Sequence, residues 1–384
     1  MRRRFRIAVR QSDTGCRRHP SIELAQASAT ARTVWQVRSA FTTLWPQRVL
    51  ANFSTASYQR DMCADHITRR GALTRTGLLI GAALGTKQFA TPVLAANSVP
   101  AVASASQPFL YSLNMATIRG QKLGAVKEVQ VAAEAGYDAI EPWISTIEEY
   151  VKAGGKLPEL KQQISDLGLK VVGAIGFPEW MAEDEARRTK GLERAKYELE
   201  LVAQIGGTRF AAPPAGATDV VGMELQKAAD RYCALLEIGD QIGVIPQLEH
   251  WSFSKSLGRL SECVAAAMQC GHPQACVLAD VFHLFKSRSS YNNLALLSRH
   301  AAAVVHLNDY PAEPTRENQN DSHRIYPGDG AAPMGEILRY LREAGGQRVL
   351  SLELFNRECW KQDPLVVAKT GLAKMKAVVA RTAA

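Results

Sequence analysis

From residue 109 onward, short apolar runs alternate with longer stretches in which apolar residues recur every three or four positions. The short runs are typical of buried parallel strands, and the longer stretches are typical of amphipathic helices. We predict strands at residues 109–114, 139–141, 170–176, 209–213, 244–249, 276–280, 303–306 and 349–353. The matching helices are predicted at residues 123–135, 147–167, 183–205, 222–241, 257–269, 292–300, 334–344 and 364–380, the second of them broken at Gly154-Gly155.

Eight strand–helix units over about 275 residues are what a (β/α)8 barrel requires. We therefore predict an α/β fold in which residues 109–384 form a single TIM-barrel catalytic domain. A doubly wound open sheet is the structural alternative. A Gly-x-Gly-x-x-Gly turn does not follow the first predicted strand, which weakens a dinucleotide-binding interpretation.

Charge is distributed unevenly along the chain. Residues 1–105 hold 14 Arg and one Lys against four acids, a net charge of +11, so the whole-chain value of +9 leaves −2 for the remainder. The basic character therefore belongs to the N-terminal region, and bulk charge gives no argument for nucleic acid as a partner.

The N-terminal region divides into two segments. Residues 1–61 are interpreted as a leader or an over-extended start, with Met62 as the true start. Residues 62–108 read as an export signal and linker: Arg69 and Arg70 precede an apolar run, residues 77–85, that is too short to span a bilayer. This arrangement resembles a twin-arginine signal and predicts an exported, periplasmic protein. A plain secretion signal is the alternative, and the protein is cytoplasmic if the signal interpretation is wrong.

The seven cysteines show no paired spacing of the kind seen in zinc sites or disulfide frameworks. We therefore predict buried, unpaired thiols.

Four candidate metal ligands stand at the ends of the last four predicted strands: Glu249, Asp280, His306 and Glu353. In a barrel the C-terminal ends of all strands converge on one face, so these side chains would meet. Carboxylate and imidazole ligands suit one divalent cation. His283 lies three residues beyond Asp280, where it can sit beside the metal without binding it.

Tryptophans follow several predicted strands. Trp143, Trp180 and Trp251 come after the second, third and fifth strands. Indole faces around a polar pocket suit the C–H faces of sugars, so we predict these three as substrate contacts. Ordinary loop packing is the alternative for each one.

The combination of motifs resembles the sugar phosphate isomerase/epimerase superfamily, the xylose isomerase-like TIM barrels. The matching pieces are Glu249, Asp280-x-x-His283, His306-Leu-Asn-Asp309, residues 324–330 (Arg-Ile-Tyr-Pro-Gly-Asp-Gly) and Leu352-Glu353-Leu-Phe-Asn356. Ketose 3-epimerases, inosose dehydratases, hydroxypyruvate isomerases and endonuclease IV belong to that superfamily.

The resemblance implies one bound divalent ion (Mn, Mg, Co or Zn), held by Glu249, Asp280, His306 and Glu353. It also implies that Glu249 and Glu353 move a proton next to a carbonyl through an enediolate, with His283 and Arg324 contacting substrate. The expected activity is that of an exported sugar isomerase or epimerase acting on a small-molecule sugar or keto-sugar.

Three alternatives remain at this point. Keto-sugar lyase or hydratase chemistry uses the same site, and a non-catalytic sugar-binding protein represents a different class. DNA repair of the endonuclease IV type is disfavoured because it needs early histidines, and none occurs between His66 and His250, although Asp321-Ser-His323 imitates a late ligand pair. No stable membrane association is expected after processing, and a homo-oligomer is compatible with the sequence.

Overall fold

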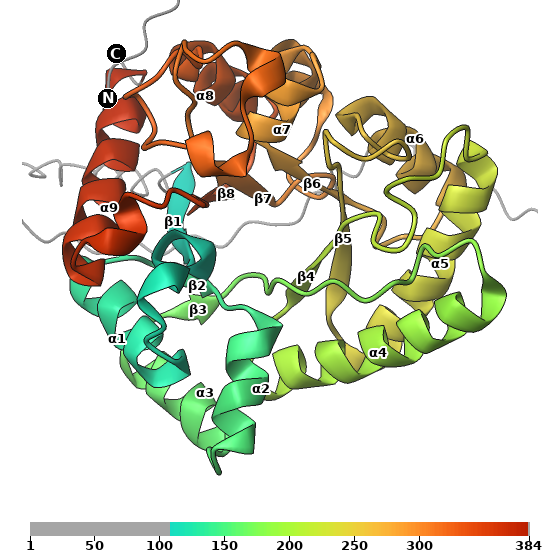
Figure 1. Ribbon diagram of the computed structural model, residues 1–384, viewed down its shortest axis with the longest axis horizontal. Helices are drawn as coiled ribbons and strands as arrows, with labels where there is room; N and C mark the ends of the chain where they lie inside the picture. The colour runs from blue at the N-terminus through green and yellow to red at the C-terminus, as the bar shows by residue number, and fades with distance from the viewer. Residues whose placement is uncertain (1–107, 383–384) are drawn as a thin grey trace, which may run out of the picture. The chain divides into compact units, whose positions relative to one another are not determined.

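The computed structural model describes residues 108–382, so the predictions for residues 1–61 and for the signal within 62–108 lie outside the described residues. Eight strands form one sheet: β1 (Phe109–Asn114), β2 (Ala139–Glu141), β3 (Lys170–Val171), β4 (Arg209–Ala212), β5 (Ile245–Glu249), β6 (Val277–Asp280), β7 (Val304–Leu307) and β8 (Arg348–Leu352). Figure 1 shows these strands at the centre of the domain, surrounded by helices.

The sheet is parallel throughout and runs in the order β3-β2-β1-β8-β7-β6-β5-β4. The first and last strands pair in register, with Ser112 opposite Ser351. Beyond the short β3, Ala211 N donates to Ala174 O at 2.9 Å, which joins the two ends of the sheet. The structure therefore confirms a single (β/α)8 barrel and excludes the open-sheet alternative.

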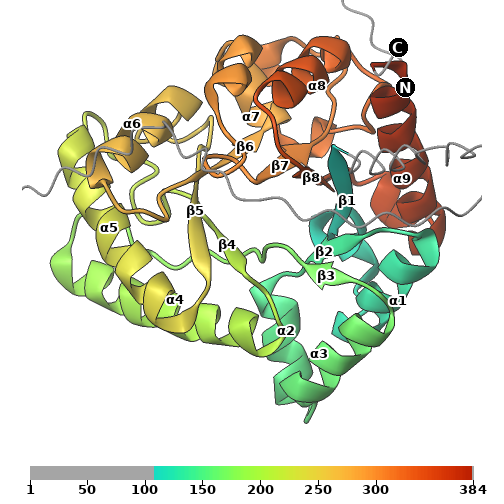
Figure 2. The same cartoon turned by 180° about the vertical axis from the view of Figure 1, so that it is seen from behind.

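The helices of the described region lie outside the strands, as Figures 1 and 2 show from opposite sides. They are α1 (Ala125–Ala135), α2 (Ile144–Lys152), α3 (Leu157–Asp166), α4 (Glu185–Gln204), α5 (Leu225–Ile242), α6 (Leu260–Cys270), α7 (Val281–Lys286), α8 (Met334–Glu343) and α9 (Pro364–Arg381). Within residues 108–382, no helix combines the length and apolar character needed to cross a bilayer.

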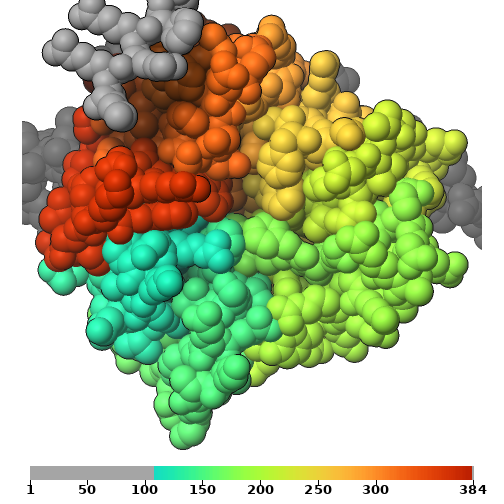
Figure 3. All heavy atoms as spheres, viewed as in Figure 1, coloured from blue at the N-terminus to red at the C-terminus, as the bar shows by residue number. Residues whose placement is uncertain are grey.

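The C-terminal helix packs against the beginning of the barrel. In Figure 3, α9 lies beside α1. Asp363 caps its N-terminus by accepting hydrogen bonds from Leu365 N and Val366 N, and Pro364 occupies the first helical position. Gly371 allows the helix to approach β8, because a Cβ there would lie 2.2 Å from a methyl group of Leu352.

The break predicted within residues 147–167 is confirmed, and one predicted helix differs from that observed. The stretch 147–167 forms the separate helices α2 and α3, because Gly154 adopts φ +90° between them. The predicted helix at 292–300 is a 3-10 turn at Tyr291–Leu296. The α-helix of this unit is instead α7, which starts directly after Asp280 because the Asp280 side chain caps it, accepting from His283 N at 2.7 Å.

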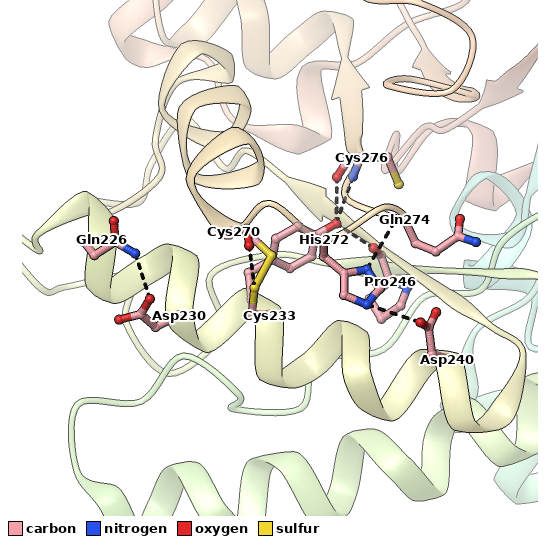
Figure 4. Close-up of a disulfide and its surroundings, with 10 residues drawn as sticks. Gln226, Asp230, Cys233, Asp240, Pro246, Cys270, His272, Gln274 and Cys276 are labelled. Carbon is pink, nitrogen blue, oxygen red and sulfur yellow. Dashed lines mark hydrogen bonds and ion pairs between the residues drawn. A yellow bond between two sulfur atoms is a disulfide. The ribbon is translucent and has the colours of Figure 1, made fainter. Parts of the chain in front are cut away.

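The prediction of unpaired thiols is wrong for two cysteines. Cys233 of α5 and Cys270 at the end of α6 form a disulfide, with Cα atoms 5.5 Å apart (Figure 4). The two residues are separated by 37 positions and meet only because α5 and α6 pack together, so their spacing gave no signal. Cys263, Cys276 and Cys359 are buried free thiols, as predicted.

Candidate metal centre

The four candidate ligands converge at the C-terminal ends of β5 to β8. Glu249 and Asp280 are the last residues of β5 and β6, His306 lies in β7, and Glu353 directly follows β8. All four side chains are buried. The Nδ1 atom of His306 lies 3.1 Å from Glu353 Oε2, 3.5 Å from Glu249 Oε1 and 3.8 Å from Asp280 Oδ2.

This donor set fits a divalent cation. His306 Nδ1 is buried and has no hydrogen-bond partner, although it faces three carboxylates. Within residues 108–382, Glu249, His306 and Glu353 form the one cluster of three ligand atoms within 4.8 Å of one another. Carboxylate oxygens with one imidazole nitrogen are ligands that Mn²⁺, Mg²⁺, Co²⁺ and Zn²⁺ accept.

Glu141, at the end of β2, was not singled out from the sequence. Its Oε2 lies 3.1 Å from His306 Nε2, and both side chains are buried. A carboxylate on the far nitrogen of a ligand imidazole fixes the tautomer and leaves the near nitrogen free to bind metal. Gly173 makes room for this carboxylate, because a Cβ at that position would lie 2.2 Å from Glu141 Oε1.

Arg324 holds the acidic side chains together. Its Nη1 donates to Asp280 Oδ2 and to Glu353 Oε2, each at 2.7 Å, and its Nη2 donates to Asp321 Oδ1 at 2.7 Å. Arg324 itself is buried. A buried guanidinium among carboxylates offsets their mutual repulsion. Asn114 of β1 adds a hydrogen bond to Glu353 Oε1 at 3.1 Å.

The environment separates the acidities of two of the carboxyl groups. Burial raises the pKa of Glu249, and the charge of Glu353 adds to this against the opposing effect of His306. Burial would also raise the pKa of Asp280, but Arg324 and His283 outweigh it and hold that pKa below its usual range. A carboxylate whose pKa is raised is the better proton acceptor near neutral pH, so Glu249 is suited to act as a base and Asp280 to remain a ligand.

A cavity of about 190 Å³ opens onto this cluster. Aromatic side chains contribute most of its apolar lining, and its polar lining consists of Glu249, Glu353, His283, Asp321 and Arg324. Its volume is small compared with the 300–1,000 Å³ of drug-sized ligand sites, which suits a small molecule. A larger hollow of about 320 Å³ lies around Val264, Met268 and His300, but it contains no carboxylate cluster.

Most sequence-predicted substrate contacts line the cavity, and one does not. Trp143, Trp251, His283 and Arg324 are among the lining residues. The prediction for Trp180 needs correction: its side chain is fully buried away from the cavity, and its Nε1 donates to Pro213 O at 2.8 Å. That indole packs in the core, where its ring centroid lies 6.2 Å from that of Tyr232.

The structure adds residues that the sequence analysis did not select. Phe177, Phe253 and Phe355 line the cavity, and Asn114 and Glu141 orient ligand side chains. Glu141 could have been noticed, since it ends a predicted strand as the four ligands do. The phenylalanines carried no comparable signal, because phenylalanine is most often a core residue.

The late Asp–His pair does not join the cluster. Asp321 is engaged by Arg324, and the ring of His323 interacts with Asn320. His250 is buried next to His283, and burial lowers the pKa of His250 to about 3, so it stays neutral. The described residues therefore show no second group of ligands of the endonuclease IV type.

Comparisons with known proteins agree with this geometry. Residues 129–378 match the family described as xylose isomerase-like TIM barrel. An inosose isomerase of Halalkalibacterium halodurans is 24% identical over 255 residues, which cover 64% of this chain and 88% of that protein. A 3-dehydroshikimate dehydratase of Pseudomonas putida is 22% identical over 231 residues, 60% of this chain, but the match spans only 36% of that protein.

Solved structures show the same fold. The IolI protein with a bound zinc atom superposes with a TM-score of 0.65 at 20% identity, covering 71% of this chain and 99% of that one. An L-ribulose 3-epimerase superposes with a TM-score of 0.57 at 20% identity, and the match covers 71% of this chain and 95% of that one. These relatives are isomerases, epimerases and dehydratases, and the chain belongs to the xylose isomerase-like TIM barrel family.

Proposed function

We propose that this protein is a metal-dependent sugar isomerase or epimerase that moves a proton at the carbon next to a carbonyl group. The observation that carries the proposal is the placement of two carboxylates, Glu249 and Glu353, on either side of the unpartnered His306 Nδ1 in one buried pocket. The inosose isomerases and the L-ribulose 3-epimerase among the relatives support it.

The residues present divide the chemistry between them. Glu249, whose pKa is raised, accepts the proton from the carbon, which leaves an enediolate. Glu353, held by Arg324 and Asn114, starts the step protonated and delivers its proton to the opposite face or to the neighbouring carbon. Exchange with solvent then removes the proton from Glu249 and restores the one on Glu353. His283 lines the cavity and is placed to contact a substrate oxygen, while Arg324, also at the cavity, holds the carboxylates of Asp280 and Glu353 in position for the substrate. A divalent cation held by Glu249, Asp280, His306 and Glu353 would supply Lewis-acid polarisation of the carbonyl oxygen.

A dehydratase is the second candidate, and the match to 3-dehydroshikimate dehydratase favours it. Removal of the same proton, followed by loss of hydroxide from the next carbon and its protonation to water, gives an unsaturated ketone. A non-catalytic sugar-binding protein has less support, because a binder needs no pair of buried carboxylates such as Glu249 and Glu353 in the pocket.

Solvent exchange tests the proposal. Protein loaded with Mn²⁺ is incubated in D2O with L-ribulose, with an inosose and with 3-dehydroshikimate, and the recovered compounds are examined by mass spectrometry and NMR. The proposal predicts deuterium in recovered sugar or in an isomer of it. An unsaturated product would assign the dehydratase. Measurable binding with neither deuterium nor product would leave the sugar-binding protein.

We also propose that the protein is exported. The signal predicted at Arg69 and Arg70 lies outside the described residues, but the Cys233–Cys270 disulfide supports export because such bonds persist mainly in oxidising compartments. Replacing both arginines with lysine should block export of the full chain. Unchanged secretion would point to a signal that does not depend on twin arginines.

A further inference from the structure

Aromatic side chains form an unbroken series around the cavity. We call this series the aromatic collar; it consists of Phe355, Trp143, Phe177, Trp251 and Phe253. The ring centroids of successive members lie 6.0, 5.4, 5.5 and 5.0 Å apart. Each ring therefore contacts the next, so the collar is continuous from Phe355 to Phe253.

His283 and Arg324 close the collar. The imidazole of His283 lies 6.0 Å from the ring of Phe253, and its Nε2 is 3.3 Å from Arg324 Nη2. The guanidinium of Arg324 in turn lies 5.2 Å from the ring of Phe355. A substrate that reaches Glu249 and Glu353 through this cavity must therefore pass a ring of flat side chains.

Several polar groups of the closed ring are already engaged. Arg324 directs its nitrogens to Asp280, Glu353, Asp321 and His283. The indole N–H of Trp143 donates to Asn114 Oδ1 at 3.3 Å. Three of the five collar members are phenylalanines, which offer no hydrogen bond. The collar therefore presents mainly apolar ring surface to a substrate, and the guanidinium beside it is committed to carboxylates.

Two collar members are also unusually exposed. The side chain of Phe177 is 42% exposed and that of Phe253 is 58% exposed. Single exposed hydrophobic residues are common, but these two belong to a contiguous apolar surface next to a buried charged centre. A contiguous apolar surface of this kind marks a place where an apolar group binds.

We propose that the aromatic collar is a subsite for a flat, apolar group, an aromatic ring, carried by the hydroxyketone that reaches Glu249 and Glu353. The proposal deepens the proposed function and rests on it, because it takes the hydroxyketone to occupy the candidate metal centre. Ring-to-ring contacts stabilise such a group.

Two probes test the subsite. Hydroxyacetone and 2-hydroxyacetophenone share one hydroxyketone and differ in a methyl against a phenyl group. Their dissociation constants are measured by titration calorimetry with the full chain loaded with Mn²⁺. We expect the phenyl compound to bind wild type about tenfold or more tightly than the methyl compound. Phe253→Ala and Phe177→Ala should each reduce this ratio by about threefold or more, because each removes one ring that would contact the phenyl group of the probe.

Tyr197→Ala is the matched control. Tyr197 is an aromatic residue with the same 42% exposure as Phe177, but it lies on α4 under Arg194 and does not line the cavity. Its replacement should leave the affinity ratio unchanged, and far-ultraviolet circular dichroism checks that all variants fold. The subsite is overturned if the two phenylalanine variants change the ratio no more than Tyr197→Ala does, or if the phenyl compound does not bind at millimolar concentration.

The outcomes separate the subsite from the reaction. Deuterium exchange with an unaltered affinity ratio in the phenylalanine variants would reject the subsite and keep the isomerase. A ratio that falls in those variants, together with no exchange for any substrate, would keep the subsite and reject the proposed reaction.

Discussion

The two halves of the barrel contribute different things to the cavity. Strands β5 to β8 each end in, or carry near their end, a residue with a ligand atom: Glu249, Asp280, His306 and Glu353. The corresponding ends of β1 and β2 carry Asn114 and Glu141, whose side chains orient Glu353 and His306. The second half thus supplies the candidate ligands, and side chains of the first half position them.

The first half also supplies aromatic side chains that line the cavity. Trp143 and Phe177 follow β2 and β3 and line the cavity, while β4 is followed by Pro213 and Pro214. A centre built on one side of a barrel has ligands for one cation, because a second or third ion needs ligands from the other side. We therefore expect the site to hold one ion, and experiments on each half test this expectation.

The largest effect is expected in the second half. Glu353→Gln keeps the size of the side chain but removes a charge that is a candidate ligand and half of the proton-transfer pair. We expect the rate of deuterium exchange into substrate to fall by about 10⁴-fold, at the upper end of what a general acid or base contributes. Mass spectrometry of the recovered sugar measures this rate.

Glu343→Gln is the control for that variant. Glu343 is the last residue of α8 and pairs with Arg339 on the surface, so its replacement should leave exchange unchanged. Near-normal exchange in Glu353→Gln would exclude Glu353 from proton transfer.

The sequence predicted the second half of the barrel better than the first. Four strand-end ligands were recognisable because each ends an apolar run, and their convergence follows from parallel strands alone. The role of Glu141 depends on His306, 165 residues away, and on the space left by Gly173. Neither relation can be seen before the barrel closes.

Packing decided the remaining differences. Trp180 resembles Trp143 and Trp251 in its position after a strand, yet it is buried against Tyr232 in the core. The Cys233–Cys270 disulfide likewise depends on how α5 meets α6. Strand-end chemistry was therefore predictable, whereas the direction of each loop was not.

The second-largest effect concerns buried acidic side chains, which differ between the two halves. In the second half, the positive charge of Arg324 offsets the negative charges of Asp280 and Glu353. In the first half, burial of Glu128 on α1 raises its pKa from 4.5 to about 7, against the opposing charge of Arg119. The folded state therefore binds this proton more tightly than the unfolded state does, so stability is lost as pH rises from about 4.5 through 7.

Glu128→Gln removes this pH dependence. Relative to wild type, the variant should gain roughly 3 kcal/mol in the free energy of unfolding between pH 4.5 and pH 8, as 1.36 kcal/mol per pKa unit requires. Urea unfolding of both proteins at the two pH values measures the difference. An equal difference at both pH values would show that Glu128 titrates normally.

The smallest effect is expected at the junction of the two halves. Glu141→Gln keeps the side chain against Gly173 but removes the charge that faces His306 Nε2. We expect the affinity for Mn²⁺ to fall by about 10–100-fold, the usual cost of losing such a partner of a ligand histidine. Titration calorimetry of metal-free protein measures this affinity. The Glu141→Asp variant should also bind Mn²⁺ more weakly than wild type, because its carboxylate is set back by one carbon.

Glu198→Gln is the matched control. Glu198 is another buried glutamate of the first half, and it approaches Gly176 as Glu141 approaches Gly173. It pairs with Arg194 rather than with a candidate ligand, so its replacement should leave the affinity for Mn²⁺ unchanged. Equal losses in both variants would assign Glu141 a general structural role.

The most direct test of a one-sided metal centre is the stoichiometry of binding. Mn²⁺ and Zn²⁺ are titrated separately into metal-free full chain, and the same titrations are repeated with His306→Ala, which removes the central nitrogen ligand. We predict one tightly bound ion per chain for wild type and loss of that site in the variant. Three zinc ions per chain, or unaltered binding by His306→Ala, would contradict the account.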